Sequence, residues 1–310
     1  MPFDRDLLQE QDAVLLGFEN SARLLEALSY YTVPLMFFKK GADRERLLPE
    51  DFDDNSGSGV LVEVGGQHFI LTAGHCVELY QQQLCAIGVE RGPHCYAPER
   101  WPSSHRVTAG GRDYGFILVP ETEVGRFTAG RCLFASPKKF LVIRADELKK
   151  NDDWMILAGY PLEIQAKSRR GMGSRLFVYP TTLAGSGSAP QSALPTPTEP
   201  VEYIDIWVPR YGGVDPARNY ADVDIPLLGG ASGGGCWRAG VRGRERTWSP
   251  RDLRLAAVHV ASQRDRNREH RFGREILVGH HLRLIAEEER VLRSKIFALW
   301  PFLADDCWTP

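Results

Sequence analysis

The sequence has no long apolar run and no marked excess of charge of either sign. Its 38 Lys and Arg residues nearly balance 40 Asp and Glu residues, and the formal net charge is −2 at pH 7. This balance argues against attraction of the whole surface to nucleic acid or to anionic lipid. No apolar stretch approaches the roughly 20 residues that a membrane-spanning helix requires. We therefore expect neither a nucleic-acid partner nor a membrane partner.

The chain also lacks a secretory leader of the usual form. It begins Met-Pro-Phe-Asp-Arg-Asp, which is acidic. A signal peptide begins with basic residues and continues with an apolar segment. This start predicts a cytoplasmic protein.

The six cysteines include no tight Cys-x-x-Cys pair, a spacing typical of structural zinc sites. They stand at positions 76, 85, 95, 132, 236 and 307. His94 and Cys95 could be imagined in a metal cluster with Cys76 and Cys85. Without a close pair, however, we expect no metal and no other cofactor.

Composition favours a protein built from sheets. The 310 residues include 30 glycines and 20 prolines, and 43% of the residues are hydrophobic. A chain of this length can bury a substantial core and can hold two small β-barrels. The many glycines and prolines favour short strands joined by turns over a helical bundle.

A serine surrounded by glycines is the most informative stretch. Residues 229–235 read Gly-Gly-Ala-Ser-Gly-Gly-Gly, and glycines allow a backbone to aim successive N–H groups at one point. Ser232 could there be a nucleophile, although such loops also serve as linkers and phosphate cradles. A phosphate loop would continue with Lys and then Ser or Thr, whereas Cys236 and Trp237 follow here. The motif alone leaves a nucleophile and a tight turn both open.

Two upstream segments supply the partners that a nucleophilic serine needs. Residues 69–76 form an apolar strand that delivers His75 at its tip, and residues 112–119 place Asp113 at the mouth of a second apolar strand. A serine needs a base, and the base needs a carboxylate that fixes its tautomer. The three segments predict a Ser-His-Asp triad.

In this order the three segments resemble the trypsin-like serine peptidases of the chymotrypsin fold, in particular the cytosolic bacterial type. The resemblance covers roughly residues 55–290. It implies an all-β core of two six-stranded antiparallel β-barrels, to which the sequence adds N-terminal and C-terminal helices. It also implies that Ser232 attacks a peptide carbonyl, that His75 moves the proton, and that Asp113 orients the ring. The N–H groups of Gly230 and Ser232 would form the oxyanion hole.

The domain boundaries follow from composition and spacing. Apolar residues at helical spacing predict a helical extension within residues 1–30, and a second helix and tail are expected in residues 276–310. The first barrel, with His75 and Asp113, would occupy residues 31–140. The second barrel, with Ser232, would occupy residues 141–275. Within it, residues 181–200 are rich in Ser, Pro, Gly and Thr and predict a mobile loop.

Two departures from the resembled family concern activation and redox state. Secreted members carry an aspartate just before the serine, and it pairs with a freshly cut N-terminus; Ala231 stands here instead. We expect that such cleavage-dependent activation is absent, so that the loop is permanently formed or a partner orders it. Secreted relatives also bridge the cysteine beside the histidine to the preceding strand. Residues 57–66 contain no cysteine, which indicates that Cys76 stays a reduced thiol.

Substrate preference is less specified. The base of the specificity pocket would lie near Pro226, which offers no carboxylate for a basic side chain. His259 stands where glutamate-specific bacterial members carry a pocket histidine, so it could bind an acidic side chain, although packing inside the protein is the simpler role. Arginines concentrated between residues 238 and 274 could steer an acidic substrate or partner.

Two other function classes stay open at this point. The chain could be a catalytically silent scaffold that binds a protein partner through the same grooves. It could also be a nucleic-acid-responsive module that uses the arginine-rich region, but few aromatic residues stand there for stacking on bases. We expect a serine endopeptidase acting on a protein or peptide substrate, with a regulatory protein partner as a further expectation.

Overall fold

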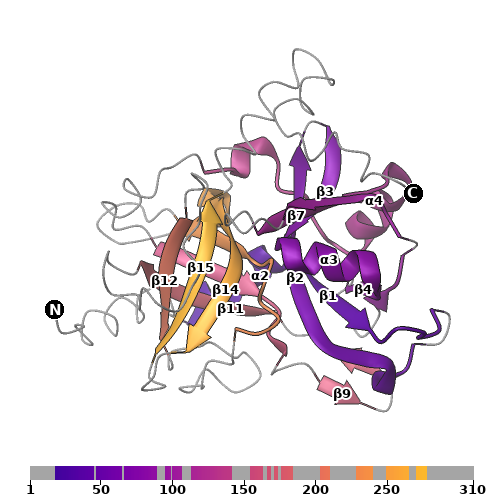
Figure 1. The fold of residues 1–310 in the computed structure, drawn as a ribbon. Helices are drawn as coiled ribbons and strands as arrows, with labels where there is room; N and C mark the ends of the chain where they lie inside the picture. The colour runs from indigo at the N-terminus through magenta and orange to yellow at the C-terminus, as the bar shows by residue number, and fades with distance from the viewer. Residues whose placement is uncertain are drawn as a thin grey trace, which may run out of the picture.

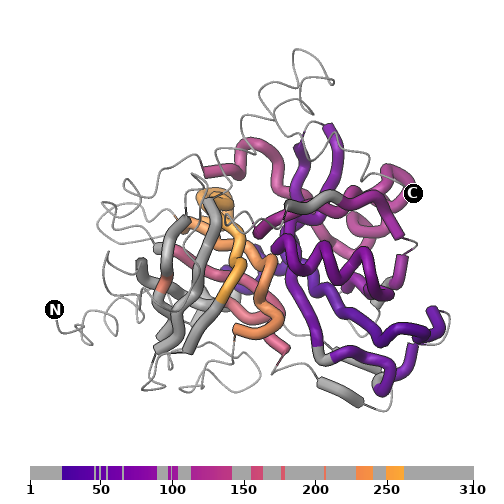
Figure 2. The backbone as a smooth tube through the Cα atoms, viewed as in Figure 1, coloured from indigo at the N-terminus to yellow at the C-terminus, as the bar shows by residue number. Residues whose placement is uncertain are grey.

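The computed structural model describes residues 18–44, 47–64, 66–88, 95–98, 100–106, 113–141, 154–162, 166–168, 171–173, 176–183, 203–209, 228–239, 249–264 and 270–277. Most of these residues lie in antiparallel strands, and few lie in helices. Figure 1 shows the strands gathered into two bodies, one from each half of the chain, and Figure 2 traces the same backbone as a tube.

The first half forms one antiparallel sheet of seven strands. In chain order they are β1 (Thr32–Phe38), β2 (Phe52–Val64), β3 (Gln67–Thr72), β4 (Leu84–Gly88), β5 (Cys95–Tyr96), β6 (Ser103–Arg106) and β7 (Tyr114–Val119). They pair in the order β5-β4-β1-β2-β3-β7-β6. The turn between β2 and β3 contains Gly66, whose φ of 67° is in the region that favours glycine.

The second half closes on itself. Its strands are β8 (Trp154–Gly159), β11 (Phe177–Leu183), β12 (Tyr203–Pro209), β13 (Gly235–Ala239), β14 (Leu253–Arg264) and β15 (His270–Leu277). They pair in the order β11-β12-β15-β14-β13-β8, and β8 returns to β11, so the six strands form a closed barrel. A separate ribbon pairs β9 (Ala166–Ser168) with β10 (Gly171–Gly173).

The predicted all-β core of antiparallel strands is therefore confirmed, and it is consistent with a chymotrypsin-like β fold. The finer prediction of two six-stranded barrels is not confirmed, because the first half pairs as a seven-stranded sheet with β5 and β6 at its edges. The short β5 adds a strand beyond β4 through two residues only, at Cys95 and Tyr96.

The part of the chain that the structure describes contains three α-helices: α2 (Phe18–Ser29), α3 (Gly74–Gln82) and α4 (Glu121–Ala129). Short 3-10 helices occur at η1 (Pro49–Asp51), η2 (Pro137–Lys139) and η5 (Pro250–Asp252), each opened by a proline. Within the described residues, no helix is both long enough and apolar enough to cross a membrane. Of the predicted C-terminal helix and tail (residues 276–310), only residues 276 and 277 are described, and they end strand β15. Of the predicted mobile loop (residues 181–200), only residues 181–183 are described, and they end strand β11.

Helix α2 is the described part of the predicted N-terminal helix. Leu24 and Leu28 are buried on one face of it, as its apolar spacing requires. It contacts β1 in the first half and both β11 and η5 in the second, and it lies between the two bodies in Figure 1. It therefore packs on both halves rather than on one barrel.

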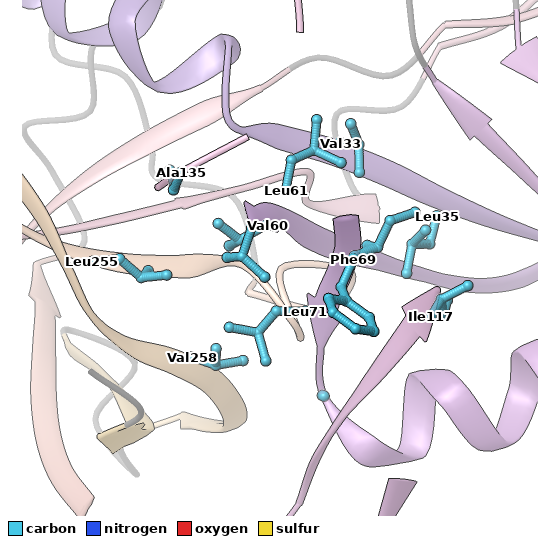
Figure 3. Packing of buried hydrophobic residues seen from close by; sticks show 14 of the residues in the cluster. Val33, Leu35, Val60, Leu61, Phe69, Leu71, Ile117, Ala135, Leu255 and Val258 are labelled. Carbon is cyan, nitrogen blue, oxygen red and sulfur yellow. The ribbon is translucent and has the colours of Figure 1, made fainter. Parts of the chain in front are cut away.

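The hydrophobic core continues across the two halves. Figure 3 shows Leu255 and Val258 of β14 packed near Val60 of β2 and Leu71 of β3, within one buried cluster. Trp237 of β13 is fully buried in the same cluster. Full burial of a leucine or valine side chain contributes about 1.5–3 kcal/mol. This contact therefore holds the two halves together next to residues 228–234, which we call the serine loop.

Candidate active site

Asp113 and His75 form a direct pair. The Oδ2 atom of Asp113 lies 2.7 Å from Nδ1 of His75, and its Oδ1 atom accepts the backbone N–H of His75 at 2.8 Å. Asp113 immediately precedes β7, which is hydrogen-bonded to β3, the strand that leads to His75. The antiparallel pairing thus brings the carboxylate to the histidine.

The local structure at His75 differs from the expected strand tip. Strand β3 ends at Thr72, and His75 is the second residue of α3. The first N–H groups of a helix have no partner within the helix. No side chain of the N-cap residue Ala73 satisfies them, so Asp113 caps the helix while it holds the imidazole. The sequence contained a signal for this helix in Val77 and Tyr80, which are buried at helical spacing.

The pKa of His75 reflects opposing effects. Burial disfavours the charged ring and lowers the pKa, but the hydrogen bond with Asp113 and the neighbouring Cys76 sulfur outweigh it and raise the pKa from 6.5 to about 10. About 40% of the His75 side chain is exposed. The site therefore favours the imidazolium that a base becomes when it accepts a proton.

The serine loop packs against the first half of the chain beside His75, at Ser58 of β2 and Cys76 of α3. The carbonyl of Ser232 accepts the N–H of Ser58 at 2.7 Å and lies 3.7 Å from the Cys76 sulfur. Gly233 adopts a φ of 86°, and a side chain there would meet Ser58 and Thr72. The half-buried Ser232 is thus seated beside the residue that follows His75.

The described side chains of His75 and Ser232 are not joined by a hydrogen bond. The structure brings His75 and Asp113 together, and it brings the backbone of Ser232 to Cys76. In unliganded enzymes the hydrogen bond between nucleophile and base is often long and tightens on binding substrate.

The N–H groups of the serine loop divide into two sets. Ala231 donates to the Leu228 carbonyl at 2.9 Å, Gly233 to the His259 carbonyl at 2.7 Å, and Gly234 to the Ala231 carbonyl at 2.8 Å. Within the described part of the chain, the N–H groups of Gly230 and Ser232 donate to no acceptor. These are the two donors that the sequence analysis assigned to an oxyanion hole, and such donors must be unpaired to act on a ligand.

Ala231 lies inside the second-half core. It is fully buried in an apolar cluster with Leu157, Leu228 and Ala257. The residue before Ser232 therefore lies among the apolar side chains of this cluster. As an alanine it cannot form an ion pair that would hold the loop.

Cys76 is a free, buried thiol, and Cys85, Cys132 and Cys236 are buried as well. Its sulfur packs on Gly57 of β2, where a Cβ would lie 2.7 Å from the sulfur. Gly57 thus occupies the place from which a bridging cysteine would reach Cys76. Among the described side chains, no group of three His, Cys, Asp or Glu could hold a metal ion. His94 lies outside the described residues.

His259 is fully buried in β14 beside the serine loop. Its carbonyl accepts the N–H of Gly233, and its N–H donates to the Gly234 carbonyl at 2.9 Å. The backbone of His259 therefore supports the loop. Pro226, the expected pocket base, lies outside the described residues, as do five arginines of the arginine-rich region: Arg242, Arg244, Arg246, Arg266 and Arg268.

Among the described residues, the site combines a histidine–carboxylate pair, a serine on a glycine loop and two unpaired N–H groups on an antiparallel β fold. No protein-family model matches the chain, and no curated protein matches it.

Solved structures offer distant likenesses. The chain is similar to the Drosophila Grass clip serine protease of the Toll pathway at 14% identity and a TM-score of 0.44, with 85% of this chain and 70% of that chain covered. It is also similar to a structure from work on coupled folding and binding of the intrinsically disordered Sesbania mosaic virus VPg protein. That likeness has 13% identity and a TM-score of 0.38, and it covers 82% of this chain and 96% of that chain. Neither likeness is close enough to support a function for this chain.

Sequence reasoning missed the residues that support the serine loop from outside. Ser58, Tyr160 and Leu162 all bond to it or to one another. Their only sequence signals were a serine between glycines in residues 57–59 and a strand ending in Gly-Tyr-Pro at residues 159–161. Neither signal shows that these residues meet.

Proposed function

We propose that this protein is a serine endopeptidase that uses His75, Asp113 and Ser232. The observation that carries the proposal is the 2.7 Å contact between Asp113 and His75, with the Ser232 loop docked against the residue that follows the histidine. Nucleophilic catalysis by serine requires a base held in one tautomer by a third group. The pair supplies that arrangement.

In the proposed reaction, the Ser232 hydroxyl attacks the carbonyl carbon of a peptide bond while His75 accepts the hydroxyl proton. The tetrahedral oxyanion is stabilised by the N–H groups of Gly230 and Ser232. His75 then donates its proton to the leaving amine, and an acyl-enzyme remains on Ser232. Water, deprotonated by His75, releases the acid product and restores the serine.

A second function, a silent scaffold for a protein partner, is favoured by one observation. The described side chains of Ser232 and His75 share no hydrogen bond, and a site that never closes would bind peptides without cleaving them. The loop would dock in the same way in an endopeptidase and in a scaffold, so an assay of chemical reactivity is needed to distinguish the two functions.

Reaction with a fluorophosphonate probe distinguishes the two functions. We expect the full-length chain to be labelled on Ser232, and labelling to disappear in Ser232→Ala and to fall sharply in His75→Ala. Ser103→Ala is the matched control, because Ser103 is a buried serine of the first-half sheet. A correctly folded wild type that resists the probe and cleaves no peptide library would leave only the scaffold.

We also propose an acidic substrate preference through His259. It is supported by the position of His259 in β14, next to the loop of Ser232. A peptide library would then show cleavage after Glu or Asp above that after Gln or Asn, and His259→Val would remove the difference. A library with no such preference would assign His259 to packing alone.

A further inference from the structure

Every polar group of Ser58 forms a hydrogen bond, and two of these bonds connect the first-half sheet to the serine loop. It lies in β2 and is fully buried. Its N–H donates to the Ser232 carbonyl at 2.7 Å, and its own carbonyl accepts the Thr72 hydroxyl at 2.6 Å. Its hydroxyl makes two further bonds. One residue therefore couples two strands of the first half to the loop of the second.

The direction of the Ser58 hydroxyl follows from its partners. The backbone N–H of Tyr160 lies 2.8 Å from the Ser58 oxygen, and an N–H can only donate. The single proton of the hydroxyl is then left for the Gly230 carbonyl, which lies at 2.8 Å. Removal of the hydroxyl would take this partner from the buried N–H of Tyr160 and from the partly buried carbonyl of Gly230, which is unfavourable on both sides.

These bonds fix the peptide planes of the loop in sequence. A trans peptide holds its C=O and N–H in one plane and in opposite directions, so a bond to the carbonyl also aims the N–H. Leu162 binds the Gly229 carbonyl at 2.8 Å and thereby aims the Gly230 N–H, and Gly234 does the same for the Ser232 N–H through Ala231. Ser58 holds the planes that follow Gly230 and Ser232, which carry the N–H groups of Ala231 and Gly233. It therefore fixes each donor residue on its C-terminal side, while Leu162 and Gly234 aim the donors themselves.

The loop has little room to adopt another conformation at Gly230. Its φ is 85°, and a Cβ there would lie 2.5 Å from the Ser56 hydroxyl and 2.7 Å from the Leu162 nitrogen. Ala231 in turn is enclosed by apolar side chains. Hydrogen bonds from outside the loop, made by Ser58 and Leu162, add to those within it.

We propose that Ser58 is a positioning residue that keeps the oxyanion site formed in the uncut chain. Its hydroxyl holds the peptide after Gly230, and its N–H holds the peptide after Ser232. The catalytic consequence rests on the proposed endopeptidase function, while the structural consequence does not. Ser58 touches no reacting atom in this scheme and acts only through the loop.

The test compares Ser58→Ala with Ser103→Ala, the same substitution at another buried serine. Two readouts are needed: kcat and KM on a peptide substrate, and hydrogen–deuterium exchange of peptides covering residues 228–234. We expect Ser58→Ala to lower kcat by about 10- to 100-fold with KM nearly unchanged, since an oxyanion donor acts in the transition state. Exchange in the loop should become faster. Ser103→Ala should change neither.

Ser58→Cys retains a weaker donor and should give intermediate kcat and intermediate exchange. It also replaces Ser58→Ala if that variant does not fold. Unchanged loop exchange in these variants would overturn the positioning role, and so would a KM effect without a kcat effect. An inactive wild type that no fluorophosphonate labels would instead refute the endopeptidase, and the exchange measurement would still decide whether Ser58 orders the loop.

Discussion

Both carboxylate oxygens of Asp113 bind the same residue, His75, one through the imidazole at 2.7 Å and one through the backbone N–H at 2.8 Å. The carboxylate is thus the cap of α3 and the partner of the ring at the same time. Because Asp113 binds both the ring of His75 and the backbone N–H near the start of α3, this one side chain determines the orientation of the imidazole and the start of the helix.

Asp113→Asn should separate these two roles. The amide oxygen of asparagine can still cap the helix, but its NH₂ group cannot accept the Nδ1 proton, so His75 would shift to the wrong tautomer. We expect kcat to fall by about four orders of magnitude, as in the general Ser-His-Asp scheme, with little loss of stability. Asp113→Ala should lose the cap as well and unfold more easily by about 1 kcal/mol. Chemical denaturation and peptide hydrolysis measure the two effects, and equal activities of the Asp113→Asn variant and the wild type would contradict the assignment.

The pH dependence of labelling should report the raised pKa of His75. The base must be neutral to accept the serine proton, so the rate of fluorophosphonate labelling should rise with pH, with its midpoint above 6.5 and toward about 10. Cys76→Ser should move the midpoint down if the sulfur contributes. A wild-type midpoint at or below 6.5 would show that burial dominates.

The same raised pKa has a consequence for stability. A folded-state pKa above the unfolded value of 6.5 means that the protonated ring stabilises the folded state below pH 6.5 and that this contribution is lost as pH rises toward 10. His75→Ala should therefore destabilise the protein more at pH 6 than at pH 10, as measured by urea unfolding. An equal difference at both values would exclude a shifted histidine.

Gly57→Cys should form a disulfide with Cys76. A Cβ at residue 57 would lie 3.5 Å from the Cys76 Cβ and 2.7 Å from its sulfur, and the first distance is within the range of natural disulfides. Under oxidation we expect a mass loss of two hydrogens and a gain of about 3 kcal/mol over the reduced form, given the loop that it closes. Gly57→Ser brings the same crowding without a thiol and is the control. Two free thiols at these positions after mild oxidation would contradict the geometry.

The sequence predicted the parts of the site that are chemically distinctive. A serine in a run of glycines, and a histidine and an aspartate beside apolar strands, are local patterns. The pairing of β3 with β7 is not local, because three strands lie between them in the chain. The resemblance to the family nevertheless predicted that Asp113 orients His75, although it did not predict that Asp113 caps the helix.

The residues that hold the loop were not predictable in the same way. Ser58 and Gly230 are separated by 172 positions, and their contact depends on how the two halves pack. That packing is set by Leu255 and Val258 against the first-half core, where many apolar pairings would satisfy the same sequence pattern. The seventh strand of the first half was not predictable either, because β5 has only two residues and therefore shows no periodicity in the sequence.

Ala231→Asp tests whether the loop can use an ion pair in place of its present anchors. The residue is fully buried among apolar side chains, and a Cβ on Gly159 would lie only 3.0 Å from the Ala231 Cβ, so there is little space for a carboxylate or for water. Burial would raise the pKa of the new carboxyl, and the destabilisation should therefore grow as pH rises above about 4, to several kcal/mol at neutral pH. Ala231→Asn has the same size without the charge and should show no such pH dependence. Thermal or urea unfolding at pH 4 and pH 7 measures both variants. An Asp variant as stable as the Asn variant at both values would mean that a cation reaches this position in the folded chain.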